Sequence, residues 1–192
     1  MSTGQWFASR DGGRWWFESG AECLDLAYTG AMGGDPAWER LHTPADLGDW
    51  LASRFDRVDR DAGERDLADG LMLRGAIARI SAALGAGREP EPLDIDTINL
   101  FAATPDIPPA LAGGTRQAGR STVRAGQALS ALAREAVRLF GEPARFHTCA
   151  AEGCGLVFYD ESRSNNRRWC SMQRCGNRSK VRAHRARTAV TR

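Results

Sequence analysis

Four cysteines near the end of the chain form two pairs with the same internal spacing. Four residues separate Cys149 from Cys154 and Cys170 from Cys175, and fifteen residues separate the two pairs. Each pair sits on a short turn and can supply two thiolates, and a tetrahedral zinc ion needs four. The spacing therefore predicts one structural zinc ion per chain, bound by these four cysteines.

Other uses of these thiols remain open from the spacing alone. Two disulfides or four unrelated core cysteines are the structural alternatives, and pairs of this kind do not exclude an iron–sulfur cluster. A zinc ion with four protein ligands has no open coordination position, so we expect no catalysis at the metal. The sequence also contains no nucleophile–base pair, phosphate-binding loop or pair of catalytic carboxylates, and we expect no enzyme.

Charge is distributed unevenly along the chain. Residues 162–192 carry ten Arg and Lys side chains and no Asp or Glu, whereas residues 1–161 carry sixteen basic and 24 acidic side chains, a net charge of −8. An acidic body with a basic tail is typical of a soluble domain whose appendage binds a polyanion. The predicted contacts with nucleic acid, duplex DNA first of all, are Arg167, Arg168, Arg174, Arg178, Lys180, Arg182, Arg185 and Arg187.

The segment after the last cysteine is expected to form a helix that starts at the metal. Asn177 can act as its N-cap, and neither proline nor glycine follows. Arg178, Arg182 and Arg185 would then share one face, which suits a phosphate backbone or a groove.

Other interpretations of the basic residues remain open besides binding to nucleic acid. A charged tail is often solvated and contacts nothing. Arg167 and Arg168 can also pair with Asp160, or offset the negative charge of a zinc ion bound by thiolates.

A β-hairpin is expected between the two cysteine pairs. Residues 156–159 and 167–169 have the composition of short strands, and the polar run 162–166 would be the turn. So small a module buries too little apolar surface to fold alone, and metal binding must supply about 10 kcal/mol or more.

Residues 1–143 are expected to form a mostly α-helical body, and residues 144–192 the zinc module. Thr43, followed by Pro44, is a good helix N-cap, and apolar residues recur at helical spacing after it. About 140 residues suffice for a separate core. Helices are expected over residues 43–55, 64–84, 94–101 and 122–140, a strand or buried segment at 15–17, a helix or strand at 23–29, and loops at 33–36 and 104–120.

The body offers few residues for chemistry. Cys23 is interpreted as a buried core thiol. Asp25 and Asn99 lie in apolar stretches and could line a small-molecule pocket, although a helix cap or a core hydrogen bond is the simpler role. The chain lacks a run of 18 apolar residues and an apolar N-terminal signal, so we expect a cytoplasmic protein.

The second cysteine pair lies within a recognisable signature. The run CSMQRCGNR at residues 170–178 resembles the CGNR-type zinc finger, and Phe158, Asp160 and residues 167–169 fit the approach to it. Upstream, residues 23–25 with Thr29, and the run ADL with the following Trp50 and Leu51, resemble the ABATE domain that usually precedes this finger. The resemblance implies a bacterial, stress-induced regulator of transcription.

Two functions from different classes fit these observations. The first is a DNA-binding transcription regulator whose body senses a signal or forms a homodimer. The alternative is an adaptor that binds RNA or protein without recognising a DNA sequence. A regulator should select particular duplex fragments, and an adaptor should not.

Overall fold

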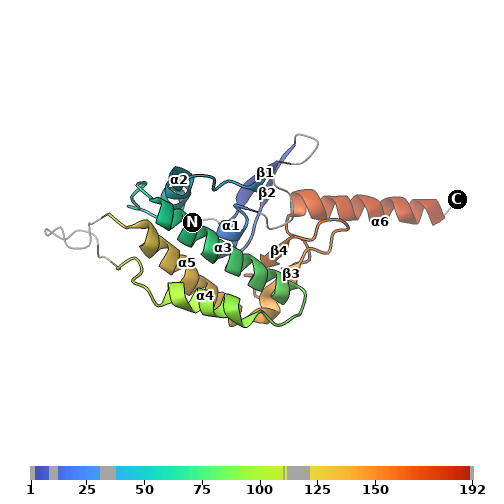
Figure 1. The fold of residues 1–192 in the computed structure, drawn as a ribbon. Helices are drawn as coiled ribbons and strands as arrows, with labels where there is room; N and C mark the ends of the chain where they lie inside the picture. The colour runs from blue at the N-terminus through green and yellow to red at the C-terminus, as the bar shows by residue number, and fades with distance from the viewer. Residues whose placement is uncertain (1–2, 9–12, 31–37, 110, 112–121, 191–192) are drawn as a thin grey trace.

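The computed structural model describes residues 3–8, 13–30, 38–109, 111 and 122–190 of the chain, and most of these residues are helical (Figure 1). The expected mainly α fold is confirmed, with two small antiparallel sheets added to the helices. The strands and α-helices are β1 (Gln5–Ala8), β2 (Arg14–Phe17), α1 (Glu22–Ala27), α2 (Pro44–Arg54), α3 (Glu64–Gly85), α4 (Pro92–Ala102), α5 (Ala125–Phe140), β3 (Phe146–Thr148), β4 (Val157–Tyr159) and α6 (Asn177–Val190).

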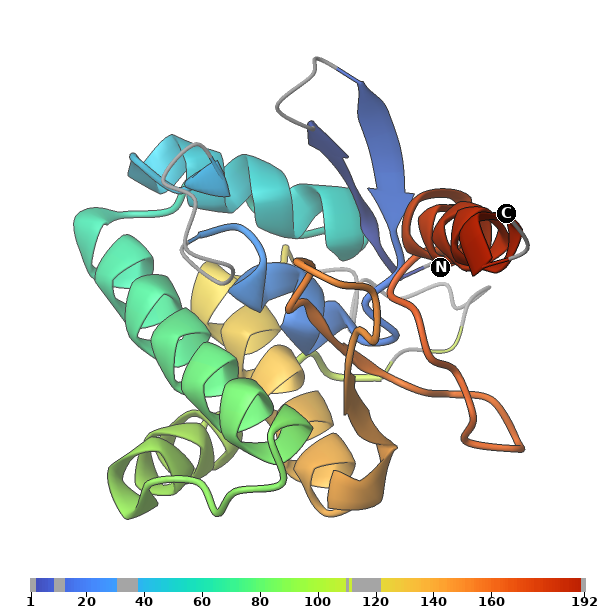
Figure 2. The ribbon, with the colours of Figure 1, turned by 90° about the vertical axis from the view of Figure 1, so that its right-hand side faces the viewer.

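The long helix α3 is the centre of the body. Its buried residues include Leu73, Ile77 and Ile80, which follow one another at intervals of three or four residues and so share one face. The helices α1, α2, α4 and α5 all contact α3, and α4 also lies against α5 (Figures 1 and 2). No described helix is both long and apolar enough to cross a lipid bilayer.

Two helix starts show how local and distant residues share the capping. At α2, the Thr43 hydroxyl accepts a hydrogen bond from the Asp46 N–H while the Asp46 carboxylate accepts one from the Thr43 N–H, so the predicted cap is confirmed. At α1, the carboxylate of Glu135 in α5 accepts hydrogen bonds from the N–H groups of Glu22 and Cys23. A residue more than a hundred positions away therefore caps α1.

The buried apolar residues form two clusters. Each cluster contains residues from before and from after position 143, the expected end of the helical body. The larger cluster fills the space between the helices and includes Phe146, Val157 and Tyr159 from the β3–β4 pair. The smaller cluster is aromatic and contains Phe7, Phe17 and Tyr28 from the N-terminal part together with Phe158 and the four paired cysteines. The zinc module and the body thus bury side chains against each other.

The predicted hairpin is wrong in its second strand. β4 pairs with β3, which precedes the first cysteine, and Phe146 lies opposite Tyr159. Residues 167–169 belong to no strand. The N–H of Arg167 donates instead to the buried Asp160 carboxylate, 2.8 Å away, so the segment is held by a side chain and not by a strand partner.

The remaining expectations for secondary structure agree with the structure or concern residues outside the described ranges. Residues 15–17 belong to a strand, although its partner β1 was not expected, and residues 22–27 form a helix. Residues 104–109 contain neither helix nor strand. The expected loop at 33–36, and most of the one at 110–120, lie outside the described residues.

Candidate metal centre

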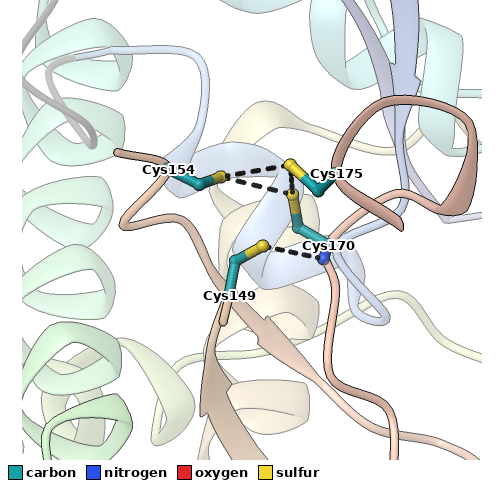
Figure 3. A group of neighbouring side chains, drawn as sticks. All are labelled: Cys149, Cys154, Cys170 and Cys175. Atoms are coloured by element: carbon teal, nitrogen blue, oxygen red, sulfur yellow. Dashed lines mark hydrogen bonds between the residues drawn. The ribbon is translucent and has the colours of Figure 1, made fainter. Parts of the chain in front are cut away.

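The four paired cysteines converge on one point from four separate places in the chain (Figure 3). Their Sγ atoms all lie within 4.8 Å of one another. Cys154, Cys170 and Cys175 form a triangle of sulfurs with sides of 3.6 Å. A tetrahedral zinc ion with Zn–S bonds of about 2.3 Å requires sulfurs about 3.8 Å apart. The cluster matches that geometry, and the cysteines are the ligands of one structural zinc ion.

The same distances decide against the alternatives raised by the sequence. A disulfide requires sulfurs about 2.05 Å apart, and all five cysteines are free. An iron–sulfur cluster places several iron and sulfide ions between its thiolates, so it needs a wider opening than this cluster provides. A single ion is what the space accommodates.

Four thiols this close perturb one another strongly in the absence of a cation. The pKa of Cys149 lies far below its ordinary value because the neighbouring thiols of Cys154 and Cys170 stabilise its thiolate. The pKa of Cys170 lies far above its ordinary value because its hydrogen bonds with Cys149 and Cys154 and its burial hold the proton. A divalent cation removes this conflict, since it stabilises all four thiolates together.

Two glycines and a backbone hydrogen bond shape the loop that carries the first pair of cysteines. Gly153 and Gly155, on either side of the second ligand, both have φ of +70°, a conformation that glycine adopts without steric cost. The N–H of Cys149 donates to the Leu156 carbonyl at 2.8 Å and closes this first loop. The N–H of Ala150 donates to the carbonyl of Arg168, which joins the first loop to the second half of the module.

In the second pair, Cys170 precedes a short π-helical turn, η3 (Met172–Gly176), and Cys175 lies within it. The predicted cap at Asn177 is wrong. The Ser171 hydroxyl accepts a hydrogen bond from the Arg174 N–H, and the Ser171 carbonyl accepts one from the Cys175 N–H. Asn177 itself has helical angles, φ −65° and ψ −42°, so the chain runs from η3 into α6 without a break. Ser171, directly after a ligand, was the capping signal that sequence reasoning missed.

The body holds the zinc module through contacts that the sequence did not reveal. The Tyr28 hydroxyl, at the end of α1, donates to the Val157 carbonyl and accepts from the Val157 N–H, both at 2.8 Å. The Tyr159 N–H donates to the carbonyl of Ser19, and the Thr148 hydroxyl donates to the carbonyl of Gly85 at the end of α3. β3 and β4 are therefore attached to both α1 and α3.

The Arg167 side chain forms hydrogen bonds with backbone carbonyls of the protein itself. Its guanidinium donates hydrogen bonds to the carbonyls of Glu18, Trp169 and Cys170 and lies 4.3 Å from the centre of the Phe158 ring. These bonds use the Nε and Nη2 groups of Arg167 to bind backbone within the described part of the chain. The contact between Arg167 and nucleic acid stays a prediction.

Two further predicted residues lie beside aromatic rings. The guanidinium of Arg174 stacks 4.4 Å from the centre of the Trp15 ring in β2, which fixes η3 against the N-terminal hairpin. Arg168 is exposed, with its guanidinium 5.3 Å from the Trp169 ring. Arg168 remains available to a ligand outside the module, and Arg174 is half-buried.

The remaining predicted residues lie on α6, which extends away from the rest of the described molecule (Figures 1 and 2). Sequence reasoning saw no acidic neighbour, yet Arg182 forms an ion pair of 2.6 Å with Glu152 in the first cysteine loop. Both side chains are mostly exposed, and such a pair stabilises a protein by only about 0–1 kcal/mol. The predicted contacts on this helix are all exposed: Arg178, Lys180, Arg182, Arg185 and Arg187.

The three residues singled out in the helical body have different environments. Cys23 is buried and unpaired, as expected. The buried Asp25 carboxylate accepts hydrogen bonds from the Ser19 hydroxyl and the Gly4 N–H and forms an ion pair with Arg54 at 2.8 Å, so its core hydrogen-bond role is confirmed. Asn99 is exposed on α4.

Comparison with known protein families agrees with this division of the chain. Residues 20–143 match the family model named ABATE, described as "Putative stress-induced transcription regulator". Residues 145–188 match the model of the CGNR zinc finger. The first match covers more than half of the 192 residues. None of the curated proteins matches the chain.

Proposed function

The chain belongs to the ABATE family and carries a CGNR zinc finger, and from this premise we propose that it is a regulator of transcription that binds duplex DNA through α6. In this proposal the zinc ion fixes the start of α6 and has no catalytic part. The body, residues 1–143, senses a signal or pairs two chains.

The observation that carries the proposal is that the described side chains of α6 form no apolar face. Val181 is the one large apolar residue among the described side chains of this helix, and it is half exposed. A helix that is polar all round gains nothing from packing on the body, and an isolated helix of 14 residues is only marginally stable in water. Like charges one turn apart, such as Arg178 and Arg182, weaken it further. A polyanion would remove that repulsion.

The positions of the charges favour a groove over a flat surface. With 3.6 residues per turn, Arg178, Arg182 and Arg185 lie on one side of α6, and Lys180 and Arg187 lie on the opposite side. The major groove of duplex DNA admits a helix between two phosphate backbones, so both sides would meet phosphates. The weak pair between Arg182 and Glu152 can open at little cost to let this happen.

The test is the salt dependence of binding to duplex DNA, measured by fluorescence anisotropy. If about five side chains neutralise phosphates, log Kd should change with log salt with a slope of magnitude about 4–5. Arg185→Ala should reduce that magnitude by about 0.9. Glu152→Gln should strengthen binding, because it frees Arg182 from its internal partner. Arg65→Ala is the matched control, since this arginine is 96% exposed at the far end of α3.

A truncation separates the helix from the zinc site. A chain that ends at Asn177 keeps all four ligands and the η3 turn, so it should retain zinc while losing most of its affinity for DNA. Sequencing the genomic fragments that the intact protein retains then tests for selection of particular sites. Equal DNA affinity of the truncated and intact proteins would refute the role of α6 and favour the adaptor.

A further inference from the structure

A cavity of about 820 Å³ lies where the helical body meets the zinc module. Its walls come from the C-terminal end of α3, from α4, from the C-terminal end of α5 and from the start of β3. Pockets that bind small molecules typically measure about 300–1,000 Å³. The cavity is therefore large enough for a molecule of two or three fused or linked rings, and it is separate from the zinc site.

The walls are apolar and partly aromatic. Phe140 and Phe146 lie with their ring centres 5.4 Å apart, and Ile80 and Ile98 are almost completely buried behind them. Val137, which also lines the cavity, is 45% exposed although it belongs to the helix that supplies much of the core. Apolar side chains left open to solvent inside a concave surface are typical of a site that binds an apolar ligand.

Polar groups at the rim narrow the chemistry of the ligand. The side chains of Arg88, Glu89 and Asn99 line the cavity, and none of them forms a hydrogen bond or ion pair with a described residue. The charges of Arg88 and Glu89 cancel, so the rim favours no net charge on the ligand. The amide of Asn99 offers one donor group and one acceptor.

We propose that this cavity binds a small, uncharged, mainly apolar molecule that carries one hydrogen-bonding group, with its apolar part against Phe140 and Phe146 and its polar group at Asn99. The proposal makes the cavity the sensing site of the body, and only that regulatory part rests on the proposed function. The binding step itself does not depend on whether the protein contacts DNA.

The position of the cavity gives a ligand a route to the zinc module. Phe146 forms one wall and begins β3, which leads directly to Cys149. Gly85 forms another wall, and a Cβ at this position would lie 3.0 Å from the Val157 side chain and 3.1 Å from the Thr148 hydroxyl. A ligand that moves α3 against β3 therefore moves the strands that carry the first zinc ligand.

Titration with the neutral fluorophore N-phenyl-naphthylamine, using the intact zinc-bound protein, tests the binding step. The fluorescence should saturate at one probe per chain. Val137→Trp puts a large side chain into the cavity from a half-exposed position and should weaken binding by at least about tenfold. Leu100→Trp is the matched control, because this residue of α4 is 65% exposed and does not line the cavity. Its affinity should stay within about twofold of the wild type.

Each remaining outcome supports or overturns one part of the proposal. Non-saturable binding, or equal weakening by both variants, would overturn the site, provided that thermal unfolding shows both variants folded. A dimer that Val137→Trp dissociates, without probe binding to either protein, would assign the cavity to a second copy and overturn the ligand. Saturating probe should change the affinity for DNA by at least about threefold, and an unchanged affinity would overturn the sensing role alone. If the protein binds no DNA, the proposed function fails while the probe still binds.

Discussion

Two of the zinc ligands have nitrogen donors next to their sulfurs. The N–H of Cys170 donates to the Cys149 sulfur at 3.4 Å, and the guanidinium of Arg178 lies 3.8 Å from the Cys175 sulfur. Four thiolates around one zinc ion leave a net charge of about −2, which such donors offset. These contacts fix the ligands in position before and after the metal binds.

Replacing one ligand tests the metal centre directly. Cys149→Ser should reduce the zinc content from one ion per chain to near zero, because a neutral hydroxyl cannot replace a thiolate in this site. Zinc is measured by elemental analysis of the purified protein. The matched control is Cys23→Ala, which removes the one cysteine outside the cluster and should leave the zinc content unchanged. Iron in the place of zinc, or zinc retained by Cys149→Ser, would contradict the assignment.

The ligands could be predicted at the residue scale because their chemistry is local. The two equal cysteine spacings identify the site without knowledge of the fold. Tyr28 could not be predicted, because its partner Val157 is 129 positions away and nothing near Tyr28 marks it. Arg167 was assigned to nucleic acid from its charge alone, and its internal acceptors become visible only when the chain is folded.

At the scale of elements, the approach of α1 to β4 is the tightest point of the junction. Gly20, just before α1, has φ of +82°, and a Cβ at this position would collide with the carbonyl of Tyr159. The neighbouring Ser19 carbonyl accepts the Tyr159 N–H at 2.8 Å. The backbone of the body therefore runs directly against the last residue of β4.

Two glycine substitutions distinguish the effect of this close contact on stability from the effect of backbone strain. Gly20→Ala should destabilise the protein by about 3 kcal/mol or more, because a methyl group overlaps the backbone of β4 in addition to the strain at positive φ. Gly87 has φ of +65°, and a methyl group at this position would have no atom within 4 Å. Gly87→Ala should therefore lower the free energy of unfolding by only about 1 kcal/mol. In a chain of this length, Gly20→Ala should therefore lower the Tm by about 6 °C or more and Gly87→Ala by about 2–4 °C. Calorimetry resolves this difference. Equal losses would show that the contact with Tyr159 is not tight.

Elements with strong local signals were predicted well, and short strands were not. Thr43 with Pro44 and Asp46 marks the start of α2 within a few residues. β3 was missed, and residues 167–169 were given its place, because three-residue strands are defined by their partners and not by their composition. The π-helical turn at Met172–Gly176 was also missed, although Ser171 directly before it supplies the capping hydroxyl.

At the scale of the whole molecule, the boundary at residue 143 divides two family matches and does not divide the core. Phe146, Val157 and Tyr159 lie after the boundary and fill the cluster between the helices. Tyr28 and Phe17 lie before it and surround the zinc ligands. Periodicity cannot tell which distant surfaces an apolar face will cover, so the shared core could not be predicted from the sequence. The separate core expected for residues 1–143 from the length of the segment is untested, and the two shared clusters predict instead that residues 146–159 complete it.

The stability of two fragments decides whether the body folds alone. A fragment of residues 1–143 lacks the three side chains that β3 and β4 contribute to the larger cluster, and burial of each such side chain stabilises a protein by about 1.5–3 kcal/mol. The sum of these losses is comparable to the whole stability of an ordinary domain, about 5–15 kcal/mol. We therefore expect this fragment to unfold in urea with a weak or broad transition, followed by circular dichroism.

A fragment of residues 1–161 is the matched comparison, because it restores β3, β4 and the buried Asp160 while still lacking Cys170 and Cys175. It should unfold more cooperatively than the shorter fragment although it cannot hold zinc tetrahedrally. Removing zinc from the intact protein with a chelator should, by the same reasoning, loosen the aromatic cluster around Tyr28 and Phe17 and lower the Tm of the helices as well as that of the module. If residues 1–143 unfold as sharply and at the same urea concentration as the intact protein, the two parts are independent, and a signal in the body would need another route to α6.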